Sequence, residues 1–194
     1  MISKRVISEI DRTLKSVWLY NIKRDYKNHF LENEDCLKNS LYFHLRKKLS
    51  KLLKDNNLII FTEWTFTELH YRADMIIAEI DPTIEGCIKD RVTNYITIIE
   101  LKYGCSASVS VSEWIKDDIR KIKNYYQNGY DCQFYFAIIY EVECGEMNLK
   151  WMDKRSTNNW ASGHVTELNS GYVNGKMKFE VNSYNGMNKD LNTI

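Results

Sequence analysis

The chain contains 194 residues, of which 44% are hydrophobic and 27% are charged, and its formal net charge is +1. This composition is typical of a soluble globular protein and argues against an intrinsically disordered chain. No stretch approaches the roughly 18 to 20 apolar residues that cross a bilayer, and charges interrupt the N-terminal segment, so neither a membrane span nor a signal peptide is expected. We therefore expect a cytoplasmic protein that consists of a single domain, residues 1–194.

Positive charge is concentrated in the first part of the chain. Residues 1–54 contain 13 Lys or Arg against 6 Asp or Glu, about +7, which leaves 14 against 20, about −6, for the remaining residues. This asymmetry is compatible with a basic surface that meets phosphate groups, and equally with solvated helix faces that have no partner.

The cysteines and histidines show none of the short spacings that bind metal ions. Five Cys and four His are scattered along the chain without a C-x-x-C pair or an H-x-x-x-H pair. Neither a zinc site nor a framework of disulfide bonds is therefore predicted.

Two amphipathic helices are predicted at the start of the chain. Apolar residues recur at helical intervals over residues 2–22 and again over residues 33–54, where a stripe of leucines is flanked by basic residues. The polar stretch "KDNN" at 54–57 ends the second helix.

Three strands are predicted next. The segments 58–66, 73–80 and 94–102 are rich in β-branched and aromatic residues, which favour extended structure. Pro82, the single proline, marks residues 81–94 as the loop between the second and the third of these strands.

The second half of the chain alternates helix and strand. A helix over 110–126 is predicted to begin at the capping-box pattern Ser110-x-x-Glu113, and an apolar strand is predicted over 132–142. A strand, a helix and a strand in succession favour a parallel crossover. Asn174-Gly175 is typical of a tight β-hairpin turn. We therefore predict an α/β protein with a mixed central β-sheet flanked by helices, and with a C-terminal β-hairpin extension over 143–194.

Charged residues end the third predicted strand, "ITIIELKYG" at 96–104. Side chains alternate between the two faces of a strand. If this strand is antiparallel to the one over 73–80, and if residue 80 lies opposite residue 94, then Asp74 faces Glu100. The residues that alternation places on one face of the third strand are Ile96, Ile98, Glu100 and Lys102.

Two carboxylates at the end of a ladder predict a metal site. Burying Asp74 beside Glu100 without compensation would cost several kcal/mol, because the two groups repel and lose their hydration. Mg²⁺ or Mn²⁺ would offset this cost, since these cations bind carboxylate oxygens and fill their remaining positions with water and phosphate. Lys102 would then lie beside a metal-bound water, where an ammonium orients the nucleophile and stabilises charge on the phosphorus centre. The combination indicates metal-assisted hydrolysis of phosphodiester bonds.

The order of these residues along the chain resembles that of a known family. Asp74 at the start of one strand, Glu100-Leu101-Lys102 at the end of the next, and then a helix and a parallel strand look like the PD-(D/E)XK nuclease superfamily, which has the restriction-endonuclease-like fold. The resemblance spans about residues 30–142. Ala73 stands where the motif name has a proline, which members of the family often lack.

The resemblance implies roles for individual residues. Asp74 and Glu100 would hold Mg²⁺ or Mn²⁺ with help from the Leu101 carbonyl, and Lys102 would position or activate water. Members of the family often carry a Glu on the helix that precedes the sheet, and Glu34 fills that position here, where it would bind a second metal or a metal-bound water.

The resemblance also implies a function. We expect a Mg²⁺-dependent endonuclease that cuts DNA in preference to RNA, in phage defence or in mobile-element biology. The alternative is a nuclease-fold module with an idle active site that binds nucleic acid or a protein partner. One small domain leaves little room for a separate sequence-reading module, so a protein partner or a homodimer would supply specificity in either case.

The site residues also have ordinary structural interpretations. Glu100 and Lys102 are compatible with an exposed ion pair worth less than about 1 kcal/mol. Glu34 is compatible with simple stabilisation of a helix start, which Glu32 or Asp35 would provide equally well.

Three further charged residues are weaker candidates. In the helix after the motif, Asp118 and Lys121 resemble the D-x-x-K pattern of the family, although a structural or solvated pair is the more ordinary interpretation. Glu63, on the first predicted strand, is a further acidic candidate.

Overall fold

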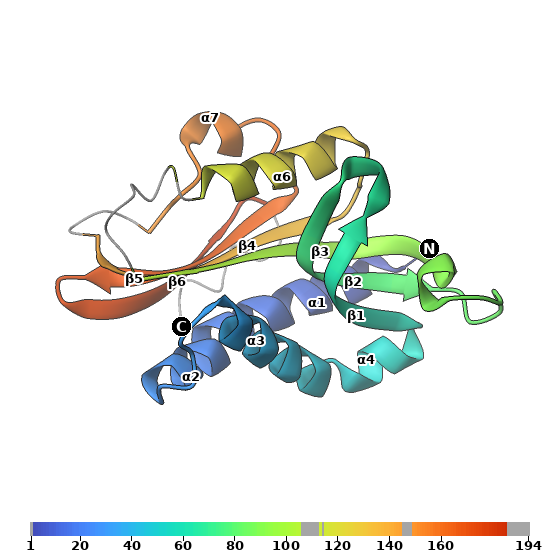
Figure 1. The fold of residues 1–194 in the computed structure, drawn as a ribbon, viewed down its shortest axis with the longest axis horizontal. Coiled ribbons are helices and arrows are strands. Elements are labelled where there is room, and N and C mark those ends of the chain that lie inside the picture. The colour runs from blue at the N-terminus through green and yellow to red at the C-terminus, as the bar shows by residue number, and fades with distance from the viewer. Residues whose placement is uncertain (1, 106–112, 114, 145–148, 186–194) are drawn as a thin grey trace.

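In the part of the chain that the structure describes, six strands form one mixed β-sheet with helices on both of its faces (Figure 1). The computed structural model describes residues 2–105, 113, 115–144 and 149–185. The strands lie in the sheet in the order in which they occur in the chain. The predicted α/β class, with a mixed sheet, flanking helices and a C-terminal hairpin, is confirmed.

The N-terminal helices cover one face of the sheet (Figure 1). The first predicted helix begins after Ser3, whose hydroxyl accepts a hydrogen bond from the N–H of Val6, and helical structure continues beyond the predicted end. The second predicted helix begins after Asn33. No helix in the described part of the chain is long and apolar enough to cross a membrane. The elements are α1 (Lys4–Ser16), a π-helical segment (Val17–Ile22), α2 (Lys23–Lys27), α3 (Glu34–Lys48) and α4 (Ser50–Asp55).

The three predicted strands follow, the second and third are longer than predicted, and neighbouring strands are antiparallel. They are β1 (Leu58–Phe66), β2 (Tyr71–Ile80) and β3 (Val92–Gly104). Short 3-10 turns precede β2 and β3, at Thr67–Leu69 and at Ile88–Arg91.

The second half of the sheet contains both parallel and antiparallel pairs. β3 and β4 are parallel and are connected through α6, which confirms the predicted crossover. Ser110 of the predicted capping box lies outside the described residues, and α6 begins at Lys116. The elements are α6 (Lys116–Gln127), β4 (Gln133–Glu143), α7 (Lys154–Thr157), β5 (Val165–Val173) and β6 (Lys176–Ser183).

The C-terminal hairpin extends the same sheet. β5 is parallel to β4, and β6 is antiparallel to β5. At the turn between them, Asn174 and Gly175 have φ angles of 53° and 69°. A two-residue hairpin turn of type I′ requires positive φ at both central residues, which Asn and Gly tolerate better than other residues do.

The pairing of β2 with β3 differs from the predicted register at one end. Ile80 pairs with Val92, not with residue 94, because the register shifts between Ile77 and Ala78 and again between Glu79 and Ile80. Next to the candidate site, however, Met75 pairs with Ile99, which is the register that the prediction assumed.

An apolar cluster lies on each face of the sheet. The cluster under the N-terminal helices includes Trp18 and Ile99, and the cluster under α6 includes Ile98 and Tyr125. Ile96 belongs to the first cluster and not, as alternation predicted, to that of Ile98. The first register shift in the β2–β3 ladder explains this correction, since an extra residue in one strand reverses the alternation on one side of it.

Candidate active site

β2 and β3 bring Asp74 and Glu100 next to each other. The ladder pair Met75–Ile99 directly precedes them, and Oδ2 of Asp74 accepts the backbone N–H of Leu101 at an N to O distance of 2.7 Å. The Glu100 side chain is fully buried and Asp74 is partly buried. The two carboxylates that the sequence proposed as metal ligands therefore share one end of the ladder.

Burial makes the ionised form of both carboxyl groups costly. Loss of solvent raises the pKa of Glu100 well above its ordinary value, and the charge of Asp74 raises it further. Burial also raises the pKa of Asp74, although the N–H of Leu101 and the charge of Lys121 act in the opposite direction. A cation placed between the two groups would favour the ionised form of both.

Glu34 joins this cluster from the first turn of α3. The buried leucines of α3 pack in the apolar cluster that also contains residues of β3, and so they hold this turn close to the strand. Burial raises the pKa of Glu34, and the charge of Asp74 raises it further. The neighbouring acids are placed differently, because Glu32 is exposed and Asp35 pairs with Lys38 at 2.8 Å.

α6 supplies the charges that lie against Glu100 and Lys102. Nζ of Lys121 lies 3.3 Å from Oε2 of Glu100 and 3.2 Å from Oδ1 of Asp118. The second oxygen of Asp118 lies 2.9 Å from Nζ of Lys102. The hydroxyl of Tyr125 donates a hydrogen bond to Oε1 of Glu100 at 3.2 Å. Asp118 and Lys121 therefore link the two charged residues of the motif.

These ion pairs keep both lysines charged. Burial alone would lower the pKa of Lys102, but the hydrogen bond and the charge of Asp118 raise it above its ordinary value. For Lys121, the charges of Glu100 and Asp118 likewise outweigh burial, so its pKa is raised. A charged Lys102 can orient a water molecule or stabilise negative charge on a phosphate.

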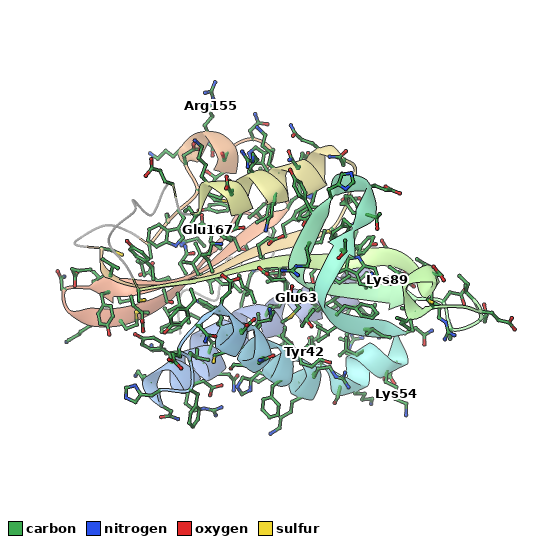
Figure 2. The ribbon with its side chains drawn as sticks, in the orientation of Figure 1. Tyr42, Lys54, Glu63, Lys89, Arg155 and Glu167 are labelled. Carbon is green, nitrogen blue, oxygen red and sulfur yellow. The ribbon has the colours of Figure 1, made fainter. Side chains whose placement is uncertain are left out.

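Asp74 has a further charged neighbour on β1, which pairs with the edge of β2 opposite to β3. Glu63 of β1 pairs with Lys38 of α3 and with Arg72 of β2, and its charge contributes to the raised pKa of Asp74. Figure 2 shows Glu63 at the centre of the viewed face, between α3 and the hairpin formed by β1 and β2. The sequence marked Glu63 as a candidate, but it pointed to neither Lys38 nor Arg72, because no local pattern connects residues so far apart in the chain.

The donor atoms of the cluster fit a hard divalent cation. Four carboxylates against two ammonium groups leave a formal charge of −2, which one such cation would balance. Carboxylate and carbonyl oxygens are the ligands that Mg²⁺ and Mn²⁺ prefer. The charged groups counted are Glu34, Asp74, Glu100, Lys102, Asp118 and Lys121.

The protein would hold such a cation with few side chains. Within the described ranges, no group of three or more His, Cys, Asp or Glu side chains is arranged to bind a metal ion. A cation at Asp74 and Glu100 would therefore take further ligands from the Leu101 carbonyl and from water, which is common for Mg²⁺.

Comparison of the chain with models of protein families, with curated proteins and with solved structures gave no match. The described residues form an α/β protein with a mixed six-stranded sheet. Its candidate site is a partly buried cluster of carboxylate and ammonium groups on β2, β3, α3 and α6.

Proposed function

We propose that this protein is a metal-dependent nuclease with a restriction-endonuclease-like core, and that it hydrolyses phosphodiester bonds in DNA. Helices before the sheet, an antiparallel β1–β2–β3 meander and a helical crossover to a parallel β4 support the core assignment. Glu34 starts α3 before the sheet, Asp74 lies on β2 and Glu100 lies near the end of β3, and this order along the chain supports the proposal.

One observation carries the proposal. Asp74 and Glu100 are neighbouring buried or partly buried carboxylates whose pKa values are both raised, and Lys102 follows two residues later on the same strand. Holding like charges together out of water reduces the stability of the fold. Titratable groups with such perturbed pKa values are therefore concentrated at sites where function requires them.

Each residue of the site would have a separate role in hydrolysis. Asp74, Glu100 and the Leu101 carbonyl would hold Mg²⁺ or Mn²⁺, which when bound lowers the pKa of a water molecule and offsets charge on the phosphate. Lys102, fixed by Asp118 at 2.9 Å, would orient the attacking water and stabilise the charge that develops on phosphorus. Glu34 would hold further water or a second cation at the same centre.

Cleavage of a supercoiled plasmid tests the assignment. We expect nicked and linear products with Mg²⁺ or Mn²⁺, none in excess chelator, and a loss of at least about 100-fold in rate for Asp74→Ala and Lys102→Ala, because each removes a group that acts on the reacting centre. Asp117→Ala and Lys123→Ala are matched controls, since both residues are exposed on α6. Equal cleavage by the wild type and by Asp74→Ala would contradict the proposal.

A second candidate function is a nuclease-fold module with an idle site, which binds nucleic acid or a protein partner. The contact of Lys121 with Glu100 favours it, because this ammonium already neutralises part of the charge that would attract a metal. Calorimetry with Mn²⁺ separates the two functions. An absence of Mn²⁺ affinity in a wild type that still binds DNA would favour the idle module.

The charge distribution supports nucleic acid as the partner. The end of α3 and the following α4 carry exposed basic side chains, and Figure 2 shows Lys54 of α4 at the margin of the viewed face. Such residues attract phosphates without regard to sequence, so specificity would come from a protein partner or from a homodimer. A role in phage defence or in mobile elements is part of this proposal. The exposed cations are Arg46, Lys47, Lys48, Lys51 and Lys54.

A further inference from the structure

Glu63 has an unusual backbone conformation in the middle of β1. Its φ angle is +55°, which is in the left-handed region that a residue with a side chain rarely adopts inside a strand. The ladder pairs on either side are Thr62 with Met75 and Trp64 with Ala73, so Glu63 lies at the level of Asp74. A strained backbone persists only where the surrounding structure compensates for it.

This conformation reverses the direction of the side chains along β1. Leu58 and Ile60, before Glu63, pack in the cluster under the N-terminal helices, whereas Trp64 and Phe66, after it, pack in the cluster under α6. In a regular strand, residues separated by an even number share one face. Glu63 therefore introduces a reversal of the kind that bulges cause near functional sites.

The partner strand reverses at the same level. Met75 and Ile77 of β2 pack under the N-terminal helices, whereas Ala73 packs under α6. Figure 1 shows the consequence, since the hairpin formed by β1 and β2 bends away from the rest of the sheet and rises beside α6. Asp74 lies at this bend, and so does the carboxylate of Glu63.

Two cations hold the Glu63 carboxylate. Nζ of Lys38 contacts Oε1, and Nε of Arg72 lies 2.7 Å from Oε2. Lys38 is largely buried and also pairs with Asp35, so its charge is already shared by two carboxylates. The Arg72 side chain is 68% exposed. Its shortest contact with Glu63 is through Nε, and no hydrogen bond joins its two terminal nitrogens to another of the described residues, so both are open to a ligand.

We propose that Arg72 binds a phosphate of the nucleic-acid backbone beside the Asp74–Glu100 centre, and that Glu63 is a positioning residue that holds the guanidinium there. An arginine anchored through Nε presents its two terminal nitrogens as a fork that matches two oxygens of a phosphate. Glu63 fixes the direction of that fork because its own carboxylate is held by Lys38. This inference rests on the proposed nuclease function and adds the substrate contact to it.

Equilibrium binding measures this contact separately from hydrolysis. The probe is a fluorescein-labelled 20-base-pair DNA duplex, followed by anisotropy in Ca²⁺ between 50 and 200 mM salt, with gel electrophoresis to show that the duplex stays intact. We expect Arg72→Ala to weaken binding about 5-fold and to reduce the slope of log K against log salt by about 0.9, which is the effect of one lost phosphate contact. In Mg²⁺, the same variant should raise KM while kcat stays within about 3-fold.

A matched control is available on α1. Arg12 is 59% exposed and pairs with Glu9, much as Arg72 pairs with Glu63. Arg12→Ala should leave the affinity and the salt slope unchanged. Arg72→Lys should retain most of the salt slope but only part of the affinity, because an ammonium keeps the charge and lacks the fork.

Variants of Glu63 test the positioning role. Glu63→Gly relieves the backbone strain, so we expect a melting temperature no lower than that of the wild type together with weaker DNA binding. Glu63→Gln keeps the side-chain volume and should weaken binding similarly. Wild-type binding by both variants would overturn the positioning role.

The failures of the two proposals can be told apart. If Arg72→Ala binds with wild-type affinity and salt slope, the phosphate contact is overturned, whether or not the wild type cleaves. If the wild type cleaves no DNA but loses affinity in Arg72→Ala, the contact is supported and the proposed hydrolysis is contradicted. If the wild type does not bind the duplex, the contact is overturned.

Discussion

The ammonium of Lys121 lies 3.3 Å from the carboxylate of Glu100, a fully buried group that lies 21 positions earlier in the chain. Through Asp118 the same ammonium is connected to Lys102, so α6 carries both counter-charges of the motif. The helix that crosses from β3 to β4 thus has a second function beside covering the sheet, because it determines the electrostatic state of the residues at the end of β3.

Replacement of Lys121 by Met should reduce stability and increase the response to metal. Without the ammonium, Glu100 is buried beside Asp74 with one cation fewer, which should cost about 1 to 2 kcal/mol of unfolding free energy. Urea unfolding in chelator measures this loss, and Mn²⁺ should restore more stability in Lys121→Met than in the wild type. The control is Lys123→Met, an exposed position on the same helix. A variant as stable as the wild type in chelator would show that the pair contributes nothing.

Replacement of Tyr125 by Phe should weaken the site without disturbing the fold. The Tyr125 ring is fully buried beside Phe66 and Tyr71, and Phe retains this packing. The lost hydroxyl donates to Glu100, so the variant should lose about 1 kcal/mol of unfolding free energy and bind Mn²⁺ several-fold more weakly. Calorimetric titration measures the affinity. Tyr126→Phe, on the same helix and outside this contact, should behave as the wild type.

The buried Glu167 of β5 should make stability depend on pH. Its carboxylate accepts the backbone N–H groups of Met152 at 2.5 Å and of Trp151 at 3.4 Å, and Figure 2 shows it in the layer between the sheet and α6. Burial raises the pKa of Glu167 to about 7 from 4.5, against these hydrogen bonds, which lower it. The folded state therefore binds the proton more tightly than the unfolded state does.

It follows that this contribution is favourable below about pH 4.5 and is lost as the pH rises through about 7. We expect the unfolding free energy of the wild type to fall by on the order of 2 kcal/mol, relative to Glu167→Gln, between pH 5 and pH 8. Urea unfolding of both proteins at the two pH values measures this difference, and the comparison cancels the titration of other groups. A difference that does not change with pH would contradict the assignment.

The buried ion pair inside α1 should contribute more to the free energy of unfolding than an exposed pair does. Asp11 and Lys15 are almost completely buried, 2.7 Å apart, and the hydroxyl of Tyr135 donates to the same carboxylate. Lys15→Met would leave Asp11 buried without this cation, and we expect a loss of about 3 kcal/mol in urea unfolding. Asp11→Asn combined with Lys15→Met should recover part of that loss. Arg12→Ala removes an exposed pair and should cost less than about 0.5 kcal/mol.

The local pattern predicted most of the elements. The leucine stripe of α3, the β-branched run of β1 and the Asn174-Gly175 turn each express a preference of nearby residues, and all three occur where predicted. The two shifts in the β2–β3 ladder were not predicted, because a bulge depends on packing across the strand pair as well as on the residues of one strand. The neighbourhood of Asp74 and Glu100 was predicted in spite of this, since both shifts lie farther along the ladder.

The sequence by itself determined the class of fold and the placement of Asp74, Glu100 and Lys102 on neighbouring strands, because periodicity and spacing are properties of short segments. Only the tertiary structure decided which charges surround them. The contacts of Lys121 with Glu100 and of Arg72 with Glu63 depend on how α6 and the bent hairpin pack on the sheet. Packing of that kind is fixed by many weak contacts between distant segments, and no short stretch of sequence contains it.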